Sequence, residues 1–327
     1  MLPAVEAPSM EPPVTLSGAG RRLSDRLGDT ALKWLTALAA AGAVGLIGLI
    51  IYKVVYGAWP AIQQFGLAFI WNQTWNAVTN QFGALAFIFG TIYTTMWAVL
   101  LGGPVAIAIG FYLSELAPAG VRGIVGSLVE MLAAIPSVVL GLWGLLVLGP
   151  VVHDTLGPWL NAAFGWTPFF SSLPESGSTF FTAVLVLTIM IIPITASISR
   201  DLFLQVPGDI KEGAYGLGLT RWEMGRGVLI PYTRGGLIAA VLLGGGRAVG
   251  EAIAVTQVIG VTTHITLDLF QTGDTLASRI ASQYQGAITN LQVASLFYLG
   301  VILLFMSLAT NFGAQIIVNR YRIERTD

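Results

Sequence analysis

The stretch TFFTAVLVLTIMIIPITASIS, residues 179–199, contains twenty-one residues and no charged side chain. A helix of this length covers about 32 Å at about 1.5 Å per residue, enough to cross the hydrocarbon core of a bilayer. Five further segments are apolar over a comparable length, near 34–56, 84–112, 124–150, 234–262 and 291–318. The sequence therefore predicts an all-α, polytopic membrane protein with six transmembrane helices.

The composition of the 327 residues is typical of a membrane protein and excludes a soluble one. Hydrophobic residues make up 55% and charged residues only 10%, against roughly 25% charged residues in soluble domains. The 39 glycines allow helices to approach closely in lipid, where burying apolar surface no longer drives association. A net charge of -1 gives no attraction to nucleic acid, so none is expected as a partner.

Residues for catalysis or metal binding are scarce. The chain has no cysteine and only two histidines, which excludes thiolate and multi-histidine metal sites as well as disulfides. It also lacks the G-x-x-x-x-G-K-[ST] loop that binds nucleotide phosphates and the usual hydrolase motifs. We therefore expect no catalytic residue, no metal site and no cofactor in this chain, which is not predicted to be an enzyme.

Basic residues are distributed unequally between the loops. Thirteen lysines and arginines fall in one set of loops, and two, Lys53 and Arg279, fall in the other. Because basic loops stay in the cytoplasm, both termini are predicted to be cytoplasmic. Residues 1–20 hold four prolines and no apolar run, so we expect a disordered tail before a transmembrane domain from 21 to 327. The outward-facing segments are then 57–83, 151–178 and 263–290.

The stretch 200–233 is predicted to be a cytoplasmic loop that another protein contacts. It holds eight charged residues in a chain otherwise poor in them. Asp209 can cap a short helix near 210–217, with Glu212 as the reciprocal carboxylate of a capping box. Gly218 can end this helix in a left-handed conformation. Spacing alone leaves a simple interfacial loop as the alternative.

Two charged residues lie deep in the fifth predicted span. Arg247 is thirteen residues from both Arg234 and Gly260, and Glu251 follows it by four residues, on one face of a continuous helix. An ionised side chain at this depth is costly and should face the bundle interior or a wet cavity. A guanidinium binds tetrahedral oxyanions through parallel hydrogen bonds, and an adjacent carboxylate keeps such binding weak enough for release. We predict an anion translocation site here, with a structural ion pair as the alternative.

Four other residues are predicted to shape or flank this pathway. Gly246 and Gly250 form a G-x-x-x-G surface that admits a neighbouring helix. Pro136 should kink the third span and free the carbonyl of Leu132, which is tolerated only where it is buried or lines a cavity. Glu130 lies one to two turns from the cytoplasmic end of that span and is a secondary candidate, because snorkelling would also explain it.

The loop resembles the EAA loop of bacterial ABC importer permeases. The matching residues are the run Glu212-Gly213-Ala214, then Gly218 six residues after the glutamate, and the run from Val228 to Pro231. Pro231 also stands where a first-turn proline could open the fifth span. Gly213 departs from the alanine of the pattern and should loosen the short helix by about 1 kcal/mol. The resemblance implies that these residues couple the chain to a separate ATPase subunit.

Longer strings are similar to PstC-type permeases of phosphate-specific ABC transporters, over about residues 22–320. They are FGLAFIW at 65–71, FGALAFIFGTIYT at 82–94, SELAP at 114–118, EMLAAIPSVVLG at 130–141, IMIIPITASISRD at 189–201, EGAYGLGLTRW at 212–222 and LGGGRAVGEAIAVTQVIG at 243–260. The resemblance implies the six-helix ABC importer permease fold. It also implies that Arg247 and Glu251 occupy the charged fifth-helix positions that this family associates with phosphate passage.

The same resemblance implies a permease subunit of an ATP-driven importer of inorganic phosphate in the bacterial cytoplasmic membrane. Its expected partners are a homologous PstA-type permease, a homodimeric PstB-type ATPase that binds ATP and Mg²⁺, and an external phosphate-binding lipoprotein. The outward segments are expected to meet that lipoprotein or cap the cavity, and a role in phosphate-starvation signalling also follows. Permeases for sulfate, molybdate or phosphonate, and a secondary anion transporter or channel, remain the alternatives.

Overall fold

The computed structural model describes residues 23–321, and the regular elements in this range are helices apart from one isolated bridge between Asn76 and Gln81. Six described helical runs are long and apolar enough to cross a membrane, which confirms the predicted number and the all-α class. The predicted tail at 1–20 lies outside the described residues. The six runs are Gly28–Phe65, Leu85–Leu116, Ser137–Phe164, Phe180–Leu204, Arg221–Val249 and Asn290–Ile317.

The chain divides into two units, the first ending at Lys53 and the second beginning at Val54. Helix α1 (Leu23–Phe65) continues across this boundary. In the first unit its apolar side chains, such as Leu38 and Ile47, are exposed. An apolar helix of this kind is suited to contact lipid or another hydrophobic protein surface.

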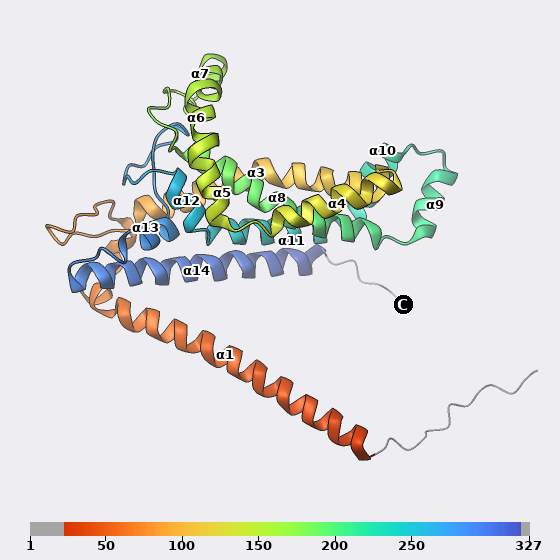
Figure 1. Ribbon diagram of the computed structural model, residues 1–327, viewed down its shortest axis with the longest axis horizontal. Coiled ribbons are helices and arrows are strands. Elements are labelled where there is room, and N and C mark those ends of the chain that lie inside the picture. Colours follow the sequence, from red (N-terminus) through yellow and green to blue (C-terminus); the bar gives the residue numbers. More distant parts are fainter. Residues whose placement is uncertain (1–22, 322–327) are drawn as a thin grey trace, which may run out of the picture. The chain divides into compact units, whose positions relative to one another are not determined.

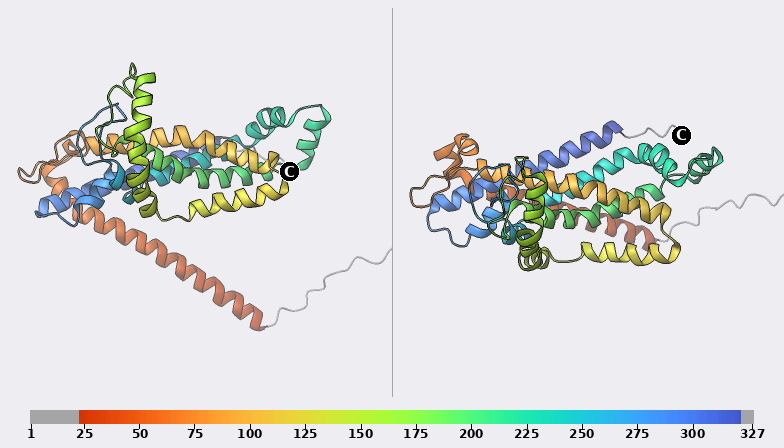
Figure 2. Two further views of the ribbon diagram at one scale, coloured as in Figure 1. Left: turned by 45° about the horizontal axis from the view of Figure 1, so that its top comes forward. Right: turned by 90° about the horizontal axis from the view of Figure 1, so that it is seen from above.

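Four long helices form the centre of the second unit. They are α3 (Leu85–Phe111), α8 (Phe180–Leu204), α11 (Ile230–Val249) and α14 (Asn290–Tyr321), which run along one common direction in Figures 1 and 2. Helices α3 and α8 touch at glycines: a methyl group at Gly102 would come within 2.8 Å of the Cδ1 atom of Ile191. The predicted use of glycine for close helix packing is therefore confirmed at this contact.

The third predicted span differs from the structure. Helix α4 (Ala119–Ala133) ends before Pro136, and α5 (Ser137–Trp143) begins after it, so 124–150 is not one helix. The Leu132 carbonyl is not free, because it accepts a hydrogen bond from the backbone N–H of Ile135 (3.4 Å). Pro136 has an extended backbone (ψ 136°) and ends the helix where a kink was expected. In Figure 1 the run from α5 to α7 (Gly157–Phe164) stands across the direction of the four long helices.

The fifth apolar run begins earlier than predicted, at α10 (Arg221–Met224), and continues into α11 through a π-helical turn at 225–229. Pro231 therefore lies inside a continuous helical run and does not open it. A proline inside a helix lacks an N–H donor and crowds the carbonyl four residues earlier. The π-helical turn widens the helix just before the proline, where this crowding would otherwise occur.

Candidate functional site

The predicted loop helix is present as α9 (Gly208–Gly216), but its N-terminus is not capped as expected. Pro207 occupies the N-cap position, and neither Asp209 nor Glu212 makes the predicted capping box. That motif lies one helix later, where Thr220 and Glu223 bond reciprocally at the start of α10. Glu212 is exposed and makes no hydrogen bond or ion pair with the described residues, so its carboxylate is available to a partner.

The C-terminus of α9 is built as predicted. Gly218 has a φ of 81°, in the left-handed region, and its N–H bonds to the carbonyl of Tyr215 (2.9 Å). The N–H of Leu219 bonds to the carbonyl of Ala214 (3.2 Å), which completes a Schellman motif. This turn directs the chain from α9 into α10, and both helices lie at one end of the bundle in Figure 1, called here the loop end.

Helix α9 is attached to the bundle by polar contacts that the sequence did not reveal. The Lys211 ammonium lies 2.6 Å from the carboxylate of Glu115, just beyond α3, and 3.0 Å from the carbonyl of Phe203 in α8. Ala214 of α9 is buried in an apolar cluster with Phe111 and Phe203. Helix α9 is therefore joined to the ends of α3 and α8 by both polar and apolar contacts.

Helix α9 and the residues that follow it also expose large apolar side chains. Leu217 is 84% exposed, Trp222 is 67% exposed and Tyr215 is 43% exposed. Glu212 and Gly213 lie on the exposed part of the same short helix. Exposed large apolar side chains close together along the chain are typical of a protein contact surface.

The predicted pair of Arg247 and Glu251 is not formed. Helix α11 ends at Val249, and a new helix, α12, begins at Ile253, so the two charges do not share a continuous helical face. The Glu251 carboxylate instead accepts a hydrogen bond from the N–H of Ala254 (3.3 Å) at the start of α12. Arg247 is exposed and makes no hydrogen bond or ion pair with the described residues.

The interruption between α11 and α12 (Ile253–Val258) begins beside the interior of α14 and not beside one of its ends. Gly246, three residues before the end of α11, faces the side chain of Asn311 in α14. Asn311 is twenty-one residues, about 31 Å, along α14 from its start at Asn290. Irregular backbone at such a depth in a membrane occurs where it is buried in protein or lines a wet cavity. An interrupted helix carrying an exposed arginine is thus a candidate ion pathway.

The glycines in close contact differ from those predicted. A methyl group at Gly244 would come within 2.7 Å of the Thr195 hydroxyl, and one at Gly245 within 3.0 Å of the Cγ2 atom of Val99. At Gly246 the nearest atom would be 3.7 Å away, an ordinary contact, and Gly250 would meet only the carbonyl of Arg247. The run of three glycines at 244–246 was the signal for this packing.

Glu130 belongs to the loop end of the bundle. Its carboxylate lies 3.3 Å from the guanidinium of Arg200, four residues before the end of α8. Thr195, which contacts Gly244, is five residues, about 7.5 Å, farther along α8 toward the interruption. The structure therefore separates Glu130 from Arg247 by more than one helical turn.

At the opposite end, a buried ion pair joins helix α13 (Leu276–Gln283) to the turn that precedes it, and the same arginine stacks on Phe87 of α3. The Arg279 guanidinium lies 2.7 Å from the carboxylate of Asp274 and 4.6 Å from the ring centre of Phe87. Burial raises the pKa of Asp274 to about 6, and the neighbouring Arg279 opposes this shift. The sequence signalled Arg279 only as a rare basic residue in its set of loops.

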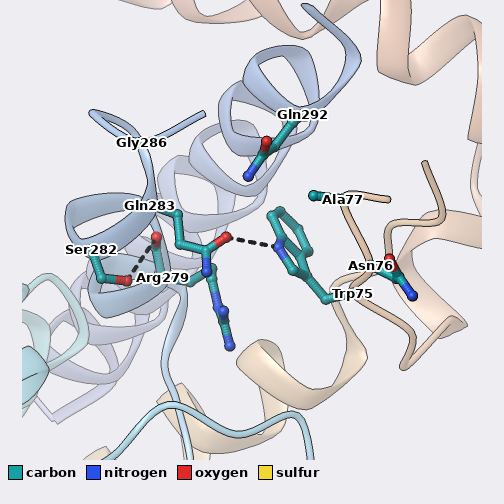
Figure 3. Close-up of a pocket in the computed structure, with 8 residues that line it drawn as sticks. All are labelled: Trp75, Asn76, Ala77, Arg279, Ser282, Gln283, Gly286 and Gln292. Atoms are coloured by element: carbon teal, nitrogen blue, oxygen red, sulfur yellow. Dashed lines mark hydrogen bonds between the residues drawn. The ribbon is translucent and has the colours of Figure 1, made fainter. Parts of the chain in front are cut away.

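A polar pocket of about 390 Å³ opens beside α13 (Figure 3). The indole N–H of Trp75 donates to the amide oxygen of Gln283 (3.0 Å) within it, as Figure 3 shows. The lining residues are Trp75, Asn76, Ala77, Arg279, Ser282, Gln283, Gly286 and Gln292. They come from the predicted outward segments 57–83 and 263–290 and from the first turn of α14, so the pocket joins these segments into one surface.

The chain matches the family described as binding-protein-dependent transport system inner membrane component over residues 102–323. It is 39% identical to the phosphate transport system permease protein PstC of Mesorhizobium japonicum, covering 92% of this chain and 91% of that protein. It is also 39% identical to the PstC protein of Xylella fastidiosa, with coverage of 94% and 96%. A probable PstC of Methanocaldococcus jannaschii is 32% identical, with coverage of 85% and 89%.

Solved ABC transporters share the fold at low sequence identity. A chain of a bacterial alginate ABC transporter superposes with a TM-score of 0.58 at 17% identity, covering 90% of this chain and 96% of that one. A chain of the MetNI methionine ABC transporter gives 0.52 at 19% identity, with coverage of 72% and 95%. By fold and by sequence, the chain belongs to the binding-protein-dependent inner membrane transport components and, within them, to the PstC family of permeases.

Proposed function

We propose that this chain is the permease subunit of an ATP-driven importer of inorganic phosphate and supplies half of its pathway. The observation that carries the proposal is the match to phosphate transport permeases over more than nine-tenths of the chain. The exposed Arg247 beside an interrupted helix supports it. In this proposal, ATP and Mg²⁺ are bound by a partner subunit, and the absence of a phosphate-binding G-x-x-x-x-G-K-[ST] loop from the sequence of this chain supports that assignment.

In the proposed pathway, Arg247 receives the phosphate and Glu251 limits how tightly it is held. The guanidinium has no fixed carboxylate partner among the described residues, so it can donate two parallel hydrogen bonds to an oxyanion. The Glu251 carboxylate accepts a hydrogen bond at the start of α12 and lies only four residues after Arg247. Its negative charge would weaken the binding of an anion at Arg247 by repulsion. An exposed charge at this depth is tolerated only beside water or another protein. We therefore place a second, homologous PstA-type permease against this surface.

The proposed coupling to ATP hydrolysis runs through α9. A homodimeric PstB-type ATPase would receive Glu212 and the exposed Tyr215 and Leu217, and the ion pair between Lys211 and Glu115 would carry the motion into the bundle. Because the ATPase is cytoplasmic in this proposal, the loop end and both termini would lie in the cytoplasm. The opposite end, including the pocket in Figure 3, would then meet an external phosphate-binding lipoprotein.

Uptake of labelled phosphate by the complex reconstituted in vesicles tests this proposal. We expect uptake to require ATP and the binding lipoprotein, and to resist competition by sulfate, molybdate and phosphonate. Arg247→Ala and Glu251→Gln should each reduce uptake at least tenfold while the subunits still co-purify. Uptake at near-parental rates in both variants would refute the assigned roles, and ATP-independent uptake would refute the importer itself.

A further inference from the structure

Asn311 of α14 is an exposed polar residue inside a span that is otherwise largely apolar. It lies seven residues, about 11 Å, before residue 318, the end of the predicted span. With a hydrocarbon core of about 30 Å, this places the side chain inside the membrane, nearer to the C-terminal end of the span than to its middle. Phe312 and Leu308, its neighbours on α14, are also exposed and carry the apolar side chains expected against lipid.

The side-chain amide of Asn311 uses only part of its hydrogen-bonding capacity. One N–H of its amide donates to the carbonyl of Ser307, one turn earlier (3.0 Å). The side chain has a second N–H and an acceptor oxygen, and the described residues supply no partner for either. An amide left without hydrogen-bond partners in hydrocarbon is costly, so a surface facing bare lipid would disfavour it.

The surroundings place this amide beside the interrupted helix. The side-chain oxygen of Asn311 lies 3.7 Å from the position that a Cβ atom at Gly246 would take, so α11 faces this oxygen with a glycine. Arg247 is the next residue along α11 and is also exposed. The two exposed polar side chains of α11 and α14 therefore occur at one depth, next to the same helix contact.

We infer that Asn311 is a second anion-contacting residue of the pathway, acting with Arg247. The unused amide N–H of Asn311 donates to an oxygen of the oxyanion while Arg247 supplies the charge. A neutral donor adds orientation without a second positive charge, which keeps the site weak enough for passage. The inference rests on the proposed phosphate pathway, and it adds α14 to the elements that line it.

Accessibility to a water-soluble thiol reagent tests whether position 311 is wet. The chain contains no cysteine, so Asn311→Cys introduces the only thiol of this subunit. In the reconstituted complex, we expect a membrane-impermeant sulfonate-bearing methanethiosulfonate to modify Asn311→Cys at least tenfold faster than Phe312→Cys, which is the matched control. Equal rates at the two positions would overturn the inference. Because this readout needs no transport, it is separate from failure of the proposed function.

Transport by two further variants tests the contact with the anion. Asn311→Asp should reduce phosphate uptake at least tenfold at pH 7.5 with assembly retained, because the new carboxylate repels the anion. Its uptake relative to the parent should recover as the pH falls and the carboxyl group is protonated. Asn311→Leu, which removes the donor but suits lipid, should reduce uptake without pH-dependent recovery. Near-parental uptake in both variants would show that Asn311 is only a packing residue.

Discussion

Replacing Arg279 with alanine is expected to loosen helix α13 and the turn that precedes it while the four long helices stay folded. The side chains of Arg279 and Asp274 are 5% and 0% exposed, so water does not screen their attraction. Removing one partner of such a buried pair costs about 3–5 kcal/mol, because the other charge is left buried and uncompensated. The stacking of the guanidinium on Phe87 adds about 1 kcal/mol.

Hydrogen exchange of the α13 backbone measures this loss directly. A cost of about 3 kcal/mol in local opening corresponds to exchange that is at least a hundredfold faster, since each 1.4 kcal/mol is a factor of ten. The double variant Asp274→Asn with Arg279→Met is the control and should recover most of the protection, because neither charge remains. Exchange in Arg279→Ala within threefold of the parent chain would refute this reasoning.

Three further predictions concern pH and the loop end. Burial raises the pKa of Asp274 to about 6, so the folded chain holds the proton more tightly than the unfolded chain. The contribution of this group to the free energy of unfolding should therefore fall as the pH rises from about 4 to about 6, and Asp274→Asn should flatten that part of a stability profile. Gly218→Ala should cost about 1 kcal/mol at its φ of 81° and reduce ATPase coupling, whereas Gly216→Ala, in open helical space, should be neutral or stabilising in a thermal-unfolding comparison. Lys211→Ala should leave the Glu115 carboxylate without its partner and lower phosphate uptake per ATP hydrolysed, and a ratio unchanged from the parent would contradict the proposed path of motion.

Features set by local composition agreed with the structure. The six apolar runs were recognisable because a span needs about twenty consecutive apolar residues, whatever surrounds it. The left-handed end of α9 was recognisable because the position needs a glycine, Gly218, just after a short helix. The predicted cap of α9 was wrong, since Pro207 fills the N-cap position, and the capping box forms instead between Thr220 and Glu223 at the start of α10.

The sequence by itself determined the membrane class, the number of spans, the loop between the fourth and fifth spans and the placement of Arg247 inside a span. All of these follow from the type of each residue and from its spacing within a local segment of the chain. Only the tertiary structure decided where α11 ends and what its charges contact. Helix α12 packs against α5 so closely that a methyl group at Gly141 would come within 2.7 Å of the Cα atom of Ala254.

That contact joins residues more than one hundred positions apart. The ion pairs of Lys211 with Glu115 and of Arg200 with Glu130 join residues that are 96 and 70 positions apart. Spacing along the chain favoured a continuous helix with Arg247 and Glu251 paired on one face. In the structure, Glu251 bonds instead to the start of α12. Local periodicity reports which residues share a helical face, whereas contacts between distant segments decide where that helix stops.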